Sequence, residues 1–175
     1  AVEDPVGHAR VDQALRVLSA LLGDEGRTLP ALRLVRMAAG HIELYLADET
    51  ELPAPFAPTS DPTAWTLAAD AVLPRRIDAA TVPCPYPSLV TVGHDLDDAH
   101  VLVDLEHVGS LSIVANRDHG VAVLAAFAVE LATTAWADDL QVTLVGCLPQ
   151  LPDALGTGRV RHVPDLELVL PVLEH

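Results

Sequence analysis

The chain has 175 residues, of which 50% are hydrophobic and 3% aromatic, enough apolar material to bury the core of one ordinary domain, alone or with a small companion. Its 25 acidic residues outnumber its 10 lysines and arginines, and the formal net charge of −15 repels nucleic-acid phosphates and anionic lipid head groups. The composition excludes a largely disordered chain and argues against nucleic acid or a membrane surface as the partner.

The N-terminal part predicts a helix followed by strands. Apolar side chains recur every three or four residues over residues 8–22, the pattern of an amphipathic helix, and Gly23 ends it. Residues 31–37 and 41–47, the second with strict alternation, predict a β-hairpin. A proline-rich loop then leads to a short strand near residues 65–67.

A second group of prolines, at residues 83–87, marks the main break in the chain. We expect a small N-terminal α+β portion over residues 1–85 and an α/β portion over residues 86–172. Residues 173–175 read Leu-Glu-His, which is typical of the start of a cloning tag. The sequence therefore reads as a fragment of a longer, multidomain protein.

The second portion alternates predicted strands with helices, which indicates an α/β fold. We expect a mostly parallel sheet with flanking helices, joined by right-handed crossovers. The expected strands cover residues 89–92, 100–105, 111–114, 141–145 and 159–163, with a long helix at 118–134 and a final helix from about residue 165.

Three segments of this portion follow one another in a recognisable order. Residues 89–95 read LVTVGHD, the next hairpin ends at Asp104 and Leu105, and residues 110–115 read SLSIVA. This order resembles the core of the FtsK/SpoIIIE-type ATPases, which include the type VII secretion ATPases. The resemblance implies a fold like a P-loop NTPase core.

The resemblance also shows what is missing. It places the Walker A pattern G-x-x-x-x-G-K-[ST] on residues 115–122, which read ANRDHGVA and keep only Gly120. Val121 and Ala122 replace the lysine that neutralises phosphate and the hydroxyl that holds Mg²⁺. Gly146 follows the strand where the Walker B aspartate belongs. We therefore expect a degenerate P-loop that does not hydrolyse ATP, with no cofactor and no enzymatic activity.

The candidate binding residues are those that remain of the phosphate loop. Asn116, Arg117, Asp118, His119 and Gly120 lie at a predicted helix N-terminus, where free N–H groups attract anions. The competing interpretation is that Asn116 or Asp118 caps the helix and occupies those donors.

A second group of polar residues is a possible metal site. Strand alternation instead favours a solvated hairpin, in which aspartates bond to their own turn. Cys84 and Cys147 lack any metal-binding spacing and read as reduced packing thiols. The residues of the possible metal site in this hairpin are His94, Asp95, Asp97, Asp98, His100, Asp104, Glu106 and His107.

The leading functional hypothesis is a non-catalytic interaction or scaffold domain that binds a protein partner or a neighbouring domain of the parent chain. Residues 121–131, the longest apolar run, are about half the length of a membrane span, so we expect no membrane contact by this part. The Ala-rich helix and the following VTLVG strand also resemble large actinobacterial proteins with LysM or transcriptional activator modules, which implies a cytoplasmic location. The alternatives are nucleotide sensing without hydrolysis and a metal-dependent activity at the His/Asp hairpin.

Overall fold

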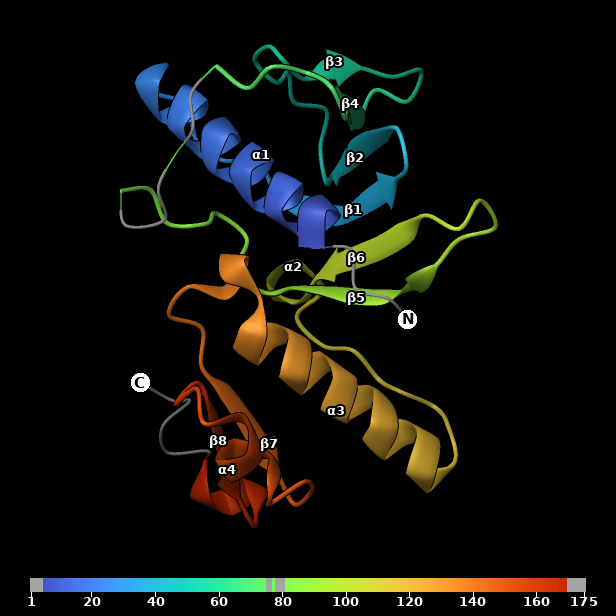
Figure 1. Ribbon diagram of the computed structural model, residues 1–175, viewed down its shortest axis with the longest axis vertical. Coiled ribbons are helices and arrows are strands. Elements are labelled where there is room, and N and C mark those ends of the chain that lie inside the picture. Colours follow the sequence, from blue (N-terminus) through green and yellow to red (C-terminus); the bar gives the residue numbers. More distant parts are fainter. Residues whose placement is uncertain (1–4, 75–76, 78–80, 170–175) are drawn as a thin grey trace.

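The computed structural model of the protein describes residues 5–74, 77 and 81–169. The larger sheet has six strands in the order β3-β4-β2-β1-β6-β5, and each neighbouring pair is antiparallel. Helix α1 (Pro5–Asp24) packs on one face of this sheet (Figure 1). The strands are β1 (Leu32–Ala38), β2 (His41–Leu46), β3 (Ala57–Pro58), β4 (Ala64–Ala68), β5 (Leu89–His94) and β6 (His100–Asp104).

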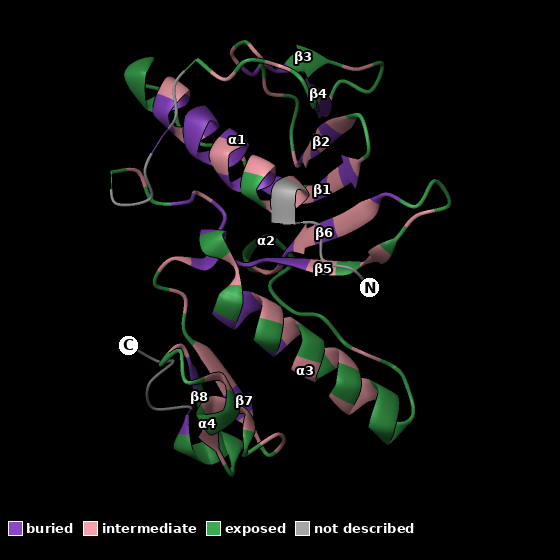
Figure 2. Ribbon diagram, in the orientation of Figure 1, coloured by how far each residue is buried: buried purple, intermediate pink, exposed green. Residues whose placement is uncertain are grey.

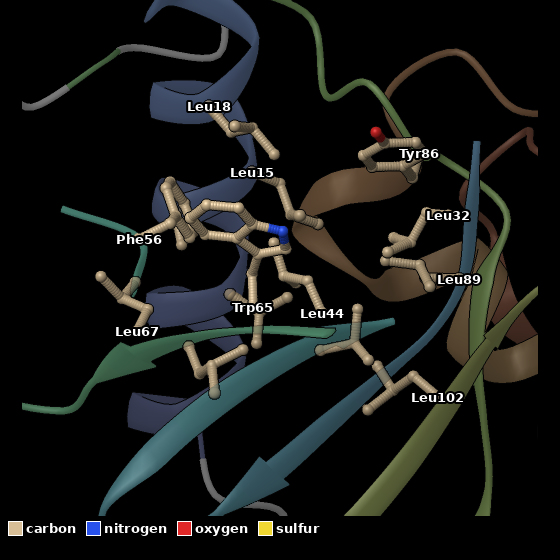
Figure 3. Packing of buried hydrophobic residues seen from close by; sticks show 14 of the residues in the cluster. Leu15, Leu18, Leu32, Leu44, Phe56, Trp65, Leu67, Tyr86, Leu89 and Leu102 are labelled. Carbon is tan, nitrogen blue, oxygen red and sulfur yellow. The ribbon is translucent and has the colours of Figure 1, made fainter. Parts of the chain in front are cut away.

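Alternation along the strands decides which side chains enter the core. Ile42, Leu44 and Leu46 of β2 are buried on the side of α1, because successive side chains of a strand point to opposite faces. Figure 3 shows Leu15 of α1 and Trp65 of β4 in the same cluster. Each leucine buried in this way contributes about 2 kcal/mol, so contact between α1 and the sheet is a main source of stability.

A smaller assembly of helices and one strand pair follows the sheet in the chain. Its two strands, β7 and β8, pair in parallel, and Ala128 and Ala132 of helix α3 pack with Leu144 and Val160 of these strands. The elements are α2 (Leu105–Val108), α3 (Arg117–Thr133), the 3₁₀ turn η1 (Ala135–Ala137), β7 (Val142–Val145), α4 (Leu151–Leu155), β8 (Val160–Val163) and the 3₁₀ turn η2 (Leu166–Leu168).

The helices predicted at residues 8–22 and 118–134 and most of the predicted strands are confirmed, but the predicted α/β fold with a mostly parallel sheet is wrong. Strands β5 and β6 form an antiparallel hairpin, and β6 then pairs with β1, where Leu34 lies opposite Val103. Strands on both sides of the prolines at residues 83–87 therefore share one sheet. Only β7 and β8 are parallel. Local sequence patterns predict which residues form strands, but they do not predict which strands pair. Strand β6 pairs with the edge of β1 that β2 leaves open.

The expected strand at residues 111–114 is also absent. Within the described part of the chain, these residues pair with no strand and run as an extended connection from α2 to the start of α3 (Figure 1). The expected final helix is only the turn η2 as far as residue 169, and its continuation at residues 170–172 lies outside the described residues, as do residues 173–175.

A buried arginine joins α1 to the rest of the chain. The Arg16 side chain is 0% exposed, and its guanidinium donates to Asp12 Oδ1 at 2.8 Å, the Val82 carbonyl at 2.6 Å, the Ala135 carbonyl at 3.2 Å and Asp138 Oδ1 at 2.8 Å. A fifth hydrogen bond runs to Asp138 Oδ2 at 3.2 Å, so carboxylates and carbonyls accept from every nitrogen of the guanidinium and compensate its charge. The arginine thereby holds the segment after α3 against α1.

Asp138 is the second half of this connection. Burial by itself would raise the pKa of Asp138, but hydrogen bonds from Arg16 and from the Cys84 N–H, which lies 2.6 Å from Asp138 Oδ2, outweigh that effect. The pKa of Asp138 therefore lies below its usual value. Its φ of 40° is a conformation that aspartate and asparagine tolerate better than most residues.

We expect Asp138→Asn to lower the free energy of unfolding by about 2–3 kcal/mol, because the variant leaves the buried Arg16 charge with one carboxylate fewer. Asparagine keeps the backbone conformation accessible, so the loss reports the charge. Urea denaturation followed by circular dichroism measures it. The matched control is Asp139→Asn at the exposed neighbour, which should change stability by less than about 0.5 kcal/mol.

The effect of Asp138→Asn should also depend on pH. Since the pKa of Asp138 is lowered by folding, its ionised form contributes stability above the unfolded value of about 3.9 and loses it as the pH falls through the folded value. An asparagine side chain does not titrate. The stability gap between the two proteins should therefore be constant above about pH 5 and narrow below about pH 4. A gap unchanged from pH 7 to pH 3 would contradict the assigned role.

Candidate functional site

The first turn of α3 holds the residues predicted as a residual phosphate loop. Asn116 adopts an extended backbone conformation and its Oδ1 accepts the backbone N–H of His119 at 2.9 Å. The alternative prediction, that Asn116 caps the helix, is thus confirmed. Arg117, Asp118 and His119 are exposed, and the Gly120 N–H donates to the Asn116 carbonyl at 2.9 Å. Asp118 lies in the first turn, where a carboxylate favours the positive end of the helix dipole.

The capped turn is poorly suited to nucleotide. The asparagine oxygen takes one N–H that a phosphate would need, and Arg117 is the one cation among the five predicted residues. Weak nucleotide binding here stays a prediction.

The body of α3 is apolar on nearly all sides, yet little of it is buried. Only Ala128, Leu131 and Ala132 of its 17 residues are buried, all near its C-terminal end. Figure 2 shows the rest of the helix as exposed or intermediate. A helix this apolar is normally enclosed by other elements. Its N-terminal turns therefore present apolar surface that no described part of the chain covers.

Four exposed large apolar side chains lie on α3 and on the segment that leads to it, and we refer to them together as the α3 apolar surface. Leu124 and Val129 on the helix are 41% and 38% exposed, and Leu111 and Val114 in the preceding segment are 50% and 97% exposed. Scattered apolar side chains are ordinary on protein surfaces. Their concentration on one helix and its leading segment makes them a candidate interaction site.

The C-terminal end of α3 is fastened to the large sheet by one carboxylate. Glu130 accepts the Thr91 backbone N–H at 3.0 and 3.1 Å through its two oxygens and the Thr91 hydroxyl at 2.7 Å. Thr91 lies at the irregularity in β5 before Gly93, where the edge strand departs from regular pairing. Glu130 thus covers part of the free edge of the sheet. In the sequence, Glu130 is the one charged residue of the apolar run 121–131, and this signal did not lead to a predicted contact.

The predicted solvated hairpin is confirmed at Asp95. Its Oδ1 accepts the backbone N–H of Asp97 at 2.9 Å and of Ala99 at 3.0 Å, so the aspartate closes its own turn. Arg36 of β1 bonds to Asp95 Oδ2 at 2.5 Å, to Glu43 at 3.2 Å and to Asp97 at 3.1 Å. The hydrogen bond from Arg36 is the main reason that the pKa of Asp95 is lowered.

The other possible ligands of the hairpin are dispersed. Asp104 is buried and accepts the Ser88 hydroxyl at 2.5 Å and the Glu106 N–H at 3.2 Å, which caps α2. His94 and His100 lie with ring centroids 4.2 Å apart. Glu106 and His107 are exposed on α2. Within residues 5–74, 77 and 81–169, no three His, Cys, Asp or Glu side chains are arranged to hold a metal ion.

The two cysteines are placed differently. Cys84 is buried beside Arg16 and Asp138, and burial raises the pKa of its thiol to about 12. It is therefore protonated at neutral pH and unreactive. Cys147 follows β7 and is partly exposed.

No protein-family model, curated protein or solved structure matches this chain. The resemblance to FtsK/SpoIIIE-type ATPases therefore stays a prediction. Among the described residues, no helix has both the length and the apolar character needed to cross a membrane.

We expect Asn116→Ala to destabilise the start of α3 by about 1 kcal/mol, because the variant removes the acceptor for the His119 N–H. Hydrogen exchange of the amides at residues 117–120 should become about fivefold faster when followed by NMR. Asn116→Ser is the matched control and should restore most of the protection. If ATP with Mg²⁺ slows exchange at these amides in the unaltered protein, the turn binds phosphate and capping is not its only role.

Proposed function

We propose that this chain is a non-catalytic interaction domain that docks a protein partner, or a neighbouring domain of its parent chain, through the α3 apolar surface. The observation that carries the proposal is an apolar helix fastened at one end and uncovered at the other. Glu130 and the buried alanines fix the C-terminal turns, so the N-terminal turns are presented on a rigid base. A rigid apolar helix that enters a groove is a common mode of protein recognition.

Charge defines the partner further. The first turn of α3 carries both Arg117 and Asp118, and the helix from Gly120 to Leu131 has no charge except Glu130, whereas the whole chain has a net charge of −15. The complementary partner has an apolar groove bordered by lysine or arginine. A second copy of this chain fits less well, since two domains of net charge −15 repel each other.

The absence of catalysis is supported by the chemistry of the available groups. The buried Cys84 thiol is held protonated, and the start of α3 has valine and alanine where an ATPase carries lysine and a hydroxyl. Contact with a partner is therefore the role that the exposed surface supports best.

The proposal predicts a position-specific cross-link. The photoreactive residue p-benzoylphenylalanine replaces Leu124 in the protein expressed in its native cells, and irradiation should give one dominant adduct, identified by mass spectrometry. Leu124 is 41% exposed, so the substitution should leave the fold intact. The yield should fall at least about tenfold when Val129→Asp is added, because a buried, unpaired carboxylate opposes docking.

The matched control carries the photoreactive residue at Val72, which is 87% exposed and lies in the loop after β4. It should not give the Leu124 adduct. The same adduct from both positions, or none from Leu124 in folded protein, would show that the α3 apolar surface is not a docking site.

A further inference from the structure

The two strands of the smaller sheet leave both of their outer edges unpaired. Strands β7 and β8 pair in parallel, from Val142 opposite Val160 to Val145 opposite Val163. Within the described part of the chain, neither strand has a second neighbour. Parallel strands occur almost only inside larger sheets whose two faces are both covered. A parallel pair that has no further strand therefore resembles part of a larger sheet.

Helices cover one face of this pair. Helix α3 contacts β7 and helix α4 contacts β8, and on this face Leu144 and Val160 are buried. Apart from Leu144, β7 is only partly buried (Figure 2). A helix is about 10 Å wide and neighbouring strands lie about 4.8 Å apart, so a strand added to the outer edge of β7 would lie close to α3.

The backbone of β7 divides its hydrogen-bonding groups between its two edges. The Val142 N–H donates to the Arg159 carbonyl, which directly precedes β8, at 2.8 Å. The groups of successive residues in a strand point to opposite edges, so the N–H and C=O groups of Thr143 and Val145 point away from β8. These groups are the ones that a further strand would bond.

The outer edges of the other strands are each protected against such pairing. Strand β3, at one end of the larger sheet, has two residues, and one of them is Pro58. Strand β5, at the other end, has its Thr91 N–H occupied by Glu130. Strand β8 carries the exposed Arg161, and charged residues disfavour edge pairing. Strand β7 reads Val-Thr-Leu-Val and has neither a charge nor a proline, so its edge is the one best suited to accept a strand.

We propose that the outer edge of β7 pairs with a β-strand of the partner that covers the α3 apolar surface. The inference rests on the proposed docking function and adds to it the mode of contact, in which the backbone of the partner bonds to Thr143 and Val145. Addition of an extended strand to an open sheet edge is a common form of protein recognition. The added strand has apolar side chains at alternate positions, because one of its faces continues the face of β7 that the helices cover.

The first test is a second cross-linking position. The photoreactive residue p-benzoylphenylalanine replaces Gln141, the exposed residue before β7, under the conditions used for Leu124. We expect an adduct with the same partner, with the cross-linked site within one extended segment of it. The matched control carries the photoreactive residue at Asp153, which is exposed on α4, the helix that covers β8. It should give at least about fivefold less of this adduct, since it lies away from the edge of β7.

The second test removes one outward N–H group of β7. Val145→Pro should lower the yield of the Leu124 adduct at least about fivefold, because proline has no N–H to donate to the added strand. Val145→Thr keeps the N–H and the β-branched shape and should leave the yield unchanged. Hydrogen exchange at the Leu144 amide, which faces β8, shows whether the pairing of β7 with β8 persists in the proline variant.

The outcomes separate this inference from the docking function. No adduct from Leu124 in folded protein would remove the docking function itself. A Leu124 adduct without one from Gln141, or an equal Leu124 yield in the two Val145 variants, would overturn the strand pairing and leave docking in place. If the proline variant loses protection at Leu144, the comparison of Gln141 with Asp153 decides, because both of those proteins keep every backbone N–H of β7.

Discussion

The architecture depends on the buried ion pair between Arg16 and its two carboxylates. Arg16 belongs to α1, Asp138 follows the 3₁₀ turn η1, and 122 residues separate them in the chain. The same aspartate accepts the Cys84 N–H, so three distant segments meet at one charge. Removing a charge from water is costly unless every donor and acceptor is matched. This requirement leaves little freedom in how the segment after α3 approaches α1.

A second set of contacts also holds the chain around the C-terminal end of α3 in place. Trp136 in η1 is fully buried in the main core, and its Nε1 donates to the Leu89 carbonyl of β5 at 3.0 Å. Glu130, six residues earlier in the chain, bonds to Thr91 of the same strand. Together these contacts hold the C-terminal end of α3 to the sheet. The N-terminal turns project beyond them, which is why an apolar helix is left uncovered.

Two surface features lie on different parts of this structure. The α3 apolar surface depends on the contacts of Glu130 and Trp136, whereas a pocket of about 360 Å³ forms where Arg10 of α1 lies against the β1–β2 hairpin and His100. Arg16 lies between them in the chain, on the same helix as Arg10.

The sequence by itself determined the local features of this protein. The spacing of apolar residues determines α1 and α3, Asn116 caps its helix, and Asp95 closes its turn, because each depends on neighbours within a few residues. Tertiary structure alone decided that β6 pairs with β1, that residues 111–114 remain unpaired, and that Glu130 reaches Thr91. The periodicity of apolar residues predicts which face of a strand is buried, but it does not predict with which other strand that strand will pair. The pocket at Arg10 has the same origin, since its walls come from segments that only the folded chain brings together.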